Sequence, residues 1–492
     1  MRARAALVLA AALLAFILSD SRFAILDDES EFVTWARAPV SETIDDYVNG
    51  AGQPEHPPLA SLLLHAWMPV GGPTKLGLRI PSIALYLAGV LILAFVARRL
   101  GGDAAFEAMA WIGALWPFGF HFGRPAEWYS LAFFLVAALT LCYLRYLERE
   151  SASRLVAFLL AAAALLYSSY YGWAIVACLI VDYALRHDTR RSIRFGGATL
   201  AALIIAFLPL VPAFAESLGY GFWTMSEGPG IAARGAIALY GIYALFVSES
   251  VAPWIWPMSI PAAACIAASA ALMWRLLPAP HRRYPIYFAV LFGGMVVLNI
   301  ASPKRLLLIS GWLLLPFSVA LAKPGEPKRS VLVAALGVVA ALGWAGIVWR
   351  GGYAAPHFVE PWASIAEEAA AAVKSGGVVV TNSPSLRFDM NYSLHRAGLV
   401  PASALPGWVR HPAVVDVSDW PAAGVTGKVL LVSGVNIANE PEAAKAEGWL
   451  AAHCTPREVR RLVPDSGFEL KRTLFPDAGQ RPYRITVTEY AC

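Results

Sequence analysis

Long apolar runs separated by short polar segments follow one another along the chain from residue 5 to residue 350. A run of about 20 apolar residues can cross a bilayer as an α-helix, in which the backbone polar groups satisfy one another. The pattern therefore predicts an α-helical polytopic membrane domain over residues 1–350. The runs lie near residues 5–19, 77–98, 104–121, 126–147, 154–169, 171–186, 193–214, 254–275, 284–301, 305–322 and 329–349.

The composition of the 492 residues agrees with a membrane protein, because 58% are hydrophobic and only 15% are charged. An ordinary soluble domain is about a quarter charged. Soluble, disordered and collagenous classes are excluded. The sequence also has no Walker, Rossmann or zinc-site spacing, which argues against ATP-driven pumps and enzymes with a soluble nucleotide fold. We expect no nucleic-acid partner.

Positive residues between the runs predict which loops are cytoplasmic, since Lys and Arg collect on that side. Placing every cluster in the cytoplasm, with the N-terminus also inside, requires about eleven crossings. Residues 59–70 and 231–247 are then better explained as helices in the outer interface. The clusters are Arg98-Arg99, then Arg145, Arg149 and Arg154, then Arg186, Arg190, Arg191 and Arg194, then Arg275, Arg282 and Arg283, then Lys323, Lys328 and Arg329.

Residues 351–492 have the composition of a soluble domain, which this topology places outside the membrane. A helix-like segment at 362–374 precedes β-branched runs at 378–380, 429–432 and 485–488, so we predict a small α/β domain. Cys454 and Cys492 both fall in this oxidising compartment. They could form a disulfide or remain unpaired, because spacing alone does not show that they meet.

The first outer loop, within residues 20–76, is unusually acidic: between residues 19 and 57 it holds nine acids against two arginines. Asp27-Asp28-Glu29 stands out because it follows the first span closely. Consecutive acids near lipid raise one another's pKa unless a cation lies nearby. An acid-rich translocated loop without function is the alternative.

The motifs that follow these acids resemble the GT-C superfamily of membrane glycosyltransferases, and most closely the branch of protein O-mannosyltransferases and the lipid A aminoarabinose transferase. The motifs are an Asp-Glu pair after the first helix, His56-Pro57-Pro58-Leu59, Arg79-Ile80-Pro81-Ser82, and Arg124 with Trp128-Tyr129. The sequence departs from the family at Ser169-Tyr170-Tyr171, where many relatives have a His before an aromatic residue.

The resemblance implies that a sugar passes from a polyprenyl-phosphate carrier to an acceptor at the outer face of the membrane. Asp28 matches the family's catalytic Asp and Glu29 its partner. Asp27 is the alternative base, since the doubled Asp leaves the register ambiguous by one residue. A carboxylate suits this chemistry because it can deprotonate the acceptor and stabilise positive charge at the anomeric carbon. Single displacement would invert that carbon.

A lipid-phosphate leaving group requires fixed positive charge on the outer side, where cationic residues are scarce. Lys304 and Arg305 begin the tenth span there and match a basic position in relatives. A pair that snorkels to lipid headgroups is the alternative. Arg79 and Arg124 are further candidates for the donor phosphate, with ion pairing to the acidic loop as their alternative.

The resemblance also suggests His56 and Tyr129 as substrate-binding residues. Tyr170 and Tyr171 could stack on a sugar ring, although interfacial aromatic belts place Tyr at such positions without any substrate. A divalent metal between the acids and His56 is possible, and the residues leave this open.

We therefore predict a GT-C-type glycosyltransferase in a bacterial inner membrane, with residues 351–492 periplasmic or extracellular. Its expected partners are membrane lipid, a polyprenyl-phosphate sugar and an envelope acceptor, which is lipid A, a surface polysaccharide, another lipid or a protein. A transporter or flippase of lipid-linked sugar is the rival hypothesis, but it predicts charges near the bilayer midplane, whereas the acids lie at the surface. An envelope scaffold is a third reading.

Overall fold

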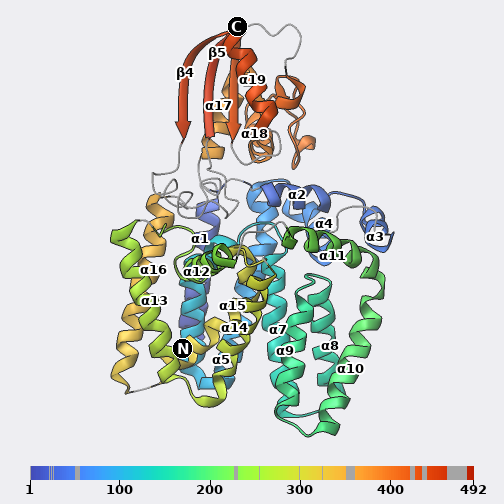
Figure 1. Ribbon diagram of the computed structural model, residues 1–492, viewed down its shortest axis with the longest axis vertical. Helices are drawn as coiled ribbons and strands as arrows, with labels where there is room; N and C mark the ends of the chain where they lie inside the picture. Colours follow the sequence, from blue (N-terminus) through green and yellow to red (C-terminus); the bar gives the residue numbers. More distant parts are fainter. Residues whose placement is uncertain are drawn as a thin grey trace.

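A computed structural model shows a helical bundle with a small sheet-containing domain at one end (Figure 1). The sheet domain is called the outer domain below, and the end of the bundle beside it the outer end. The structure describes residues 2–20, 23, 25, 27–49, 56–226, 231–253, 255–298, 300–323, 325–350, 361–420, 427–434, 440–462 and 485–492.

Each predicted apolar run overlaps a helix of the bundle. Six helices of the described chain are long and apolar enough to cross a membrane. The polytopic helical fold is confirmed, while the count of about eleven crossings stays a prediction. The helices that overlap the predicted runs are α1 (Arg2–Ser19), α5 (Lys75–Leu115), α6 (Pro117–Phe122), α7 (Tyr129–Glu148), α8 (Ala152–Leu166), α9 (Gly172–Ala184), α10 (Thr189–Phe207), α13 (Trp256–Leu276), α14 (Arg283–Val297), α15 (Leu307–Leu321) and α16 (Pro327–Arg350).

The 41-residue α5 is in fact two helices joined at a sharp bend. Gly101 and Gly102 leave helical geometry there, and Gly102 has φ of 75°, a left-handed conformation that glycine adopts without strain. The two halves correspond to the separate runs predicted at 77–98 and 104–121.

Helices α5, α7 and α15 form the centre of the bundle. Trp312 of α15 donates a hydrogen bond of 2.9 Å to the Thr140 hydroxyl of α7. Tyr86 of α5 stacks on Phe133 of α7 with ring centroids 5.5 Å apart. The first residues of all three helices lie at the outer end, so this packing brings together side chains that are far apart in sequence.

Shorter helices cover the outer end of the bundle (Figure 1). They are α2 (Asp27–Ala36), α3 (Val40–Asn49), α4 (Leu59–Gly71), α11 (Val211–Ser226) and α12 (Ile231–Val247). Such a position suits the interfacial role predicted for residues 59–70 and 231–247, which stays a prediction.

The outer domain has the predicted α/β character. Its sheet has the strand order β2-β1-β3-β5-β4, in which β2, β1 and β3 are parallel and β5 and β4 join antiparallel. Cys454 and Cys492 form a disulfide that ties the start of β4 to the chain after β5. The elements are α17 (Pro361–Lys374), β1 (Val378–Thr381), α18 (Pro384–Arg396), β2 (Val414–Asp416), β3 (Lys428–Gly434), α19 (Glu440–His453), β4 (Thr455–Leu462) and β5 (Ile485–Ala491).

Candidate active site

The predicted acidic motif forms the first turn of α2, at the outer end of the bundle. Acidic side chains are favoured there because the helix dipole places partial positive charge at a helix N-terminus. Successive helical residues point about 100° apart, so neighbouring acids face different surroundings. Glu29 is buried and Asp28 is exposed. The side chain of Asp27 lies outside the described residues.

Glu29 is held in a buried ion pair with Arg79 of α5. The Arg79 Nε and Nη2 donate to its two carboxylate oxygens at 2.8 and 2.7 Å, and the Ala126 backbone N–H donates to Oε1 at 2.8 Å. Arg79 Nη1 also donates to the Asp20 carboxylate and the Phe23 carbonyl, both at 3.1 Å. Such a bidentate pair is strong and geometrically specific, so it favours anchoring of α2 as the role of both residues.

Asp28 has opposite surroundings. Its side chain is 58% exposed and forms an ion pair with Lys304, from the 3₁₀ turn η4 (Pro303–Leu306) before α15. The Lys304 ammonium also lies 5.6 Å from the ring centroid of Tyr129, the first residue of α7. The structure thus brings the predicted base into contact with a predicted phosphate ligand from a distant part of the chain.

Arg305 extends the same cluster toward the aromatic candidates. Its side chain forms a hydrogen bond with Tyr129, and its positive charge lies close enough to His56 to disfavour the protonated imidazole. Burial, with a further effect of Arg305, lowers the pKa of His56 to about 3, so the imidazole is neutral near pH 7. The ring centroids of His56 and Trp128 lie 5.0 Å apart, and those of Trp128 and Tyr171 lie 6.3 Å apart.

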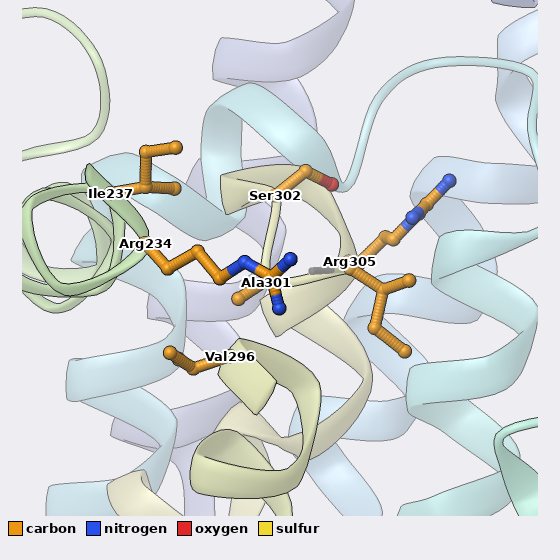
Figure 2. A pocket seen from close by; sticks show the side chains of 7 residues that line it. Arg234, Ile237, Val296, Ala301, Ser302 and Arg305 are labelled. Carbon is orange, nitrogen blue, oxygen red and sulfur yellow. The ribbon is translucent and has the colours of Figure 1, made fainter. Parts of the chain in front are cut away.

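A cavity of about 150 Å³ adjoins this cluster, between α12, the end of α14 and η4. Figure 2 shows Arg234 of α12 reaching across it beside Ala301, while the Arg305 guanidinium points away from Arg234. The Ser302 hydroxyl is buried there, and no residue in the described ranges forms a hydrogen bond with it. Sequence analysis did not single out Arg234, although the scarcity of outer cations that selected Lys304 applies to it equally.

Arg124 lies apart from the exposed cluster, in an aromatic cage. Its guanidinium carbon is 3.4 Å from the ring centroid of Phe23, 4.5 Å from that of Phe120 and 5.7 Å from that of Phe16. Cation–π contacts of this kind stabilise a buried guanidinium. The assignments of Arg79 and Arg124 to the donor phosphate stay predictions, and the surroundings of both favour a structural role.

Glu127 is a buried acid that sequence analysis missed. Among the described residues its Oε1 has no hydrogen-bond partner, and the side chain lies near Glu29 and Tyr129. Burial, reinforced by the negative charge of Glu29 and opposed by Arg79, raises the pKa of Glu127 to about 8. The carboxyl is therefore mostly protonated at pH 7. Its place just before Tyr129 is the only sequence signal for it.

Tyr170 packs against aromatic residues outside the set of candidates. Its ring packs 5.0 Å from Phe214 and 6.1 Å from Phe207, on the side of α10 and α11. Its substrate-binding role stays a prediction, because these contacts do not connect it to Asp28 or Lys304. In the described part of the chain, no three His, Cys, Asp or Glu side chains are grouped to hold a metal ion.

Comparison with known proteins bears on the fold and the class of the protein. Residues 55–215 match the family model described as dolichyl-phosphate-mannose-protein mannosyltransferase. No curated protein matches the chain in sequence. The chain has the GT-C fold and, with the family match, is identified as a membrane glycosyltransferase, as the sequence predicted.

Among solved structures, ArnT from Cupriavidus metallidurans bound to undecaprenyl phosphate has a TM-score of 0.55 at 14% identity, over 98% of this chain and 97% of that one. Its apo form has a TM-score of 0.54 at 14% identity, over the same shares of both chains. The arabinofuranosyltransferase AftD from Mycobacteria has a TM-score of 0.47 at 18% identity, with 100% of this chain and 40% of that chain covered.

Proposed function

We propose that this protein transfers a sugar from a polyprenyl-phosphate donor to a hydroxyl of an envelope acceptor at the outer face of the cytoplasmic membrane. The observation that carries the proposal is the contact between exposed Asp28 and Lys304, with Arg305 and Tyr129 beside them. A base and two cations then stand together at the outer end of the bundle. The bound undecaprenyl phosphate of ArnT supports a lipid-phosphate donor.

In the proposed reaction Asp28 takes the proton from the acceptor hydroxyl while that oxygen bonds to the anomeric carbon. The bond from this carbon to the phosphate oxygen breaks, and its electron pair leaves with the lipid phosphate. Attack from the side opposite the phosphate inverts the carbon. Asp27, whose side chain is not described, remains the alternative base.

Lys304 and Arg305 supply positive charge for the phosphate in this proposal. In the structure Lys304 neutralises Asp28. An arriving phosphate competes for Lys304, which releases the Asp28 carboxylate to act as a base. His56, neutral near pH 7, and Tyr171 are partly exposed and lie on either side of the buried Trp128, so in this proposal their rings stack on the sugar.

The test is sugar transfer from a panel of radiolabelled polyprenyl-phosphate sugars to membrane acceptors by purified protein. Wild type is compared with Asp28→Asn, Asp27→Asn and, as a matched control, Asp45→Asn at an exposed position of α3. We expect transfer from one donor, lost in Asp28→Asn and retained in Asp45→Asn.

Two outcomes would contradict the proposal. Full transfer by Asp28→Asn and by Asp27→Asn would exclude both acids as the base. If the wild type consumes no donor but moves lipid-linked sugar across liposomes, the protein is a transporter.

A further inference from the structure

The outer domain is packed into the bundle beside α2. Phe388 and Tyr392, both on α18, belong to the same buried apolar cluster as the membrane helices. Phe388 lies edge-on to Trp408, with ring centroids 5.9 Å apart. The two parts of the molecule therefore share a core at this point, so a shift of α18 disturbs the outer end of the bundle.

Asp389 is the charged centre of this contact. Its side chain is completely buried and forms an ion pair with Lys75, the first residue of α5. Burial raises the pKa of Asp389, while Lys75, Arg79 and the Ile25 backbone N–H favour its charged form. Tyr392, one turn further along α18, places its ring 5.8 Å from the Lys75 ammonium. A buried carboxylate needs such partners, because an unpaired one is strongly unfavourable.

Lys75 connects this contact to the site through α5. Lys75 and Arg79 are four residues apart and so lie on one face of the helix. Arg79 in turn holds Glu29, the residue after Asp28. The N-terminus of α5 is fixed by the Thr74 side chain, which accepts from the Gly77 N–H at 3.0 Å. Asp389 is thus linked to the first turn of α2 through two ion pairs on one rigid helix turn.

The other end of α2 is held by the outer domain as well. Arg37, just after α2, donates a hydrogen bond to the Pro406 carbonyl. The loop containing Pro406 is fixed by Asn391 of α18, whose amide donates to the Ala404 and Gly407 carbonyls at 3.0 Å each. Both ends of the helix that carries Asp28 therefore connect to α18.

We propose that α18 of the outer domain positions α2 for catalysis, with Asp389 as the positioning residue that acts through Lys75. This inference rests on the proposed function for its catalytic part. Asp389 does not touch the reacting atoms. Its contribution is to keep the Asp28 carboxylate next to the Lys304 ammonium. The outer domain is then a component of the active site rather than an independent appendage.

The test uses the full-length protein in detergent or nanodiscs with Asp389→Asn and Arg37→Gln. The matched control is Asp419→Asn, an exposed acid of the same domain. The first readout is hydrogen exchange of the α2 amides, which requires no transfer activity. Exchange reports local opening, so we expect it to accelerate about tenfold in both variants and to stay unchanged in the control.

The second readout is steady-state transfer by the folded fraction. Misplacing a base slows the chemical step, so we expect kcat to fall about tenfold or more while KM for the donor changes less than about twofold. A purely structural role would lower the folded yield and leave kcat per folded molecule unchanged. Exchanging the pair, with Asp389→Lys and Lys75→Asp together, should recover part of the kcat lost in Asp389→Asn.

Unchanged exchange in α2 in both folded variants would overturn the inference, as would faster exchange with unchanged kcat. If Asp389→Asn does not fold, Arg37→Gln tests the same coupling from the other end of α2. If the wild type shows no transfer, the proposed function fails first, and the exchange measurement still decides whether α18 holds α2.

Discussion

Asp28 and Glu29 are adjacent in the chain, yet the structure gives them opposite surroundings. Glu29 is buried, and its carboxylate is occupied by Arg79 and the Ala126 N–H. Asp28 is exposed, and within the described part of the chain it pairs with a lysine that is itself a quarter exposed. The Glu29 carboxylate is enclosed by its hydrogen-bond donors, whereas the Asp28 carboxylate is open to a second partner. The comparison favours Glu29 as the acid that anchors α2 and Asp28 as the proposed base.

The sharpest test of this difference is the pair of isosteric changes Asp28→Asn and Glu29→Gln. Loss of a general base costs about 10²–10⁴-fold in rate, so Asp28→Asn should reduce transfer by about that factor. Thermal stability should be unchanged, because the side chain is exposed. Transfer assays and thermal unfolding of the same preparations check this. A large loss of stability in Asp28→Asn would show that the two acids share one structural role.

Glu29→Gln should act mainly on stability. It leaves the buried Arg79 guanidinium with Asp20 as its remaining carboxylate partner, and breaking a buried pair costs about 3 kcal/mol. Thermal unfolding in detergent, compared with Glu42→Gln in α3, measures the difference. If Glu29→Gln folds with wild-type stability and loses only activity, Glu29 belongs to the reacting group.

Lys304→Met tests the cationic side of the exposed pair. Removing a charge-assisted contact to the donor phosphate should raise its KM about tenfold, as expected for the loss of about 1.4 kcal/mol. Lys328→Met, at an exposed position near the start of α16, is the matched control. An unchanged donor KM would remove Lys304 from the phosphate site.

Glu127 supplies a pH test of the buried region. Its pKa is raised to about 8, so between its ordinary value and pH 8 the folded protein keeps a proton that the unfolded chain releases. Stability should therefore fall as pH rises through that window, by at most about 1.4 kcal/mol per pH unit, and level off above it. Glu127→Gln should flatten this part of the profile, measured by thermal unfolding at several pH values. A profile that keeps its slope would assign the titration to another group.

Much of the architecture follows from local patterns. Apolar runs near 20 residues predict helices wherever they occur, and the predicted runs all overlap helices. Three strands and the first helix of the outer domain were also predicted. The two missed strands show the limit: β2 has three residues, and β4 reads Thr-Pro-Arg-Glu-Val-Arg-Arg-Leu, whose charges hide any alternation.

Within the site, the sequence by itself determined the chemical types: acids after the first helix, a basic pair before α15, and His56 and tyrosines as candidate substrate contacts. These signals depend on short motifs and on which charges are unusual outside a membrane. Only the tertiary structure decided which acid is buried, that Lys304 meets Asp28, and that Asp389 reaches Lys75. The physical reason is that burial and ion pairing depend on how α2, α5, α15 and α18 pack, and these helices are separated by tens to hundreds of residues.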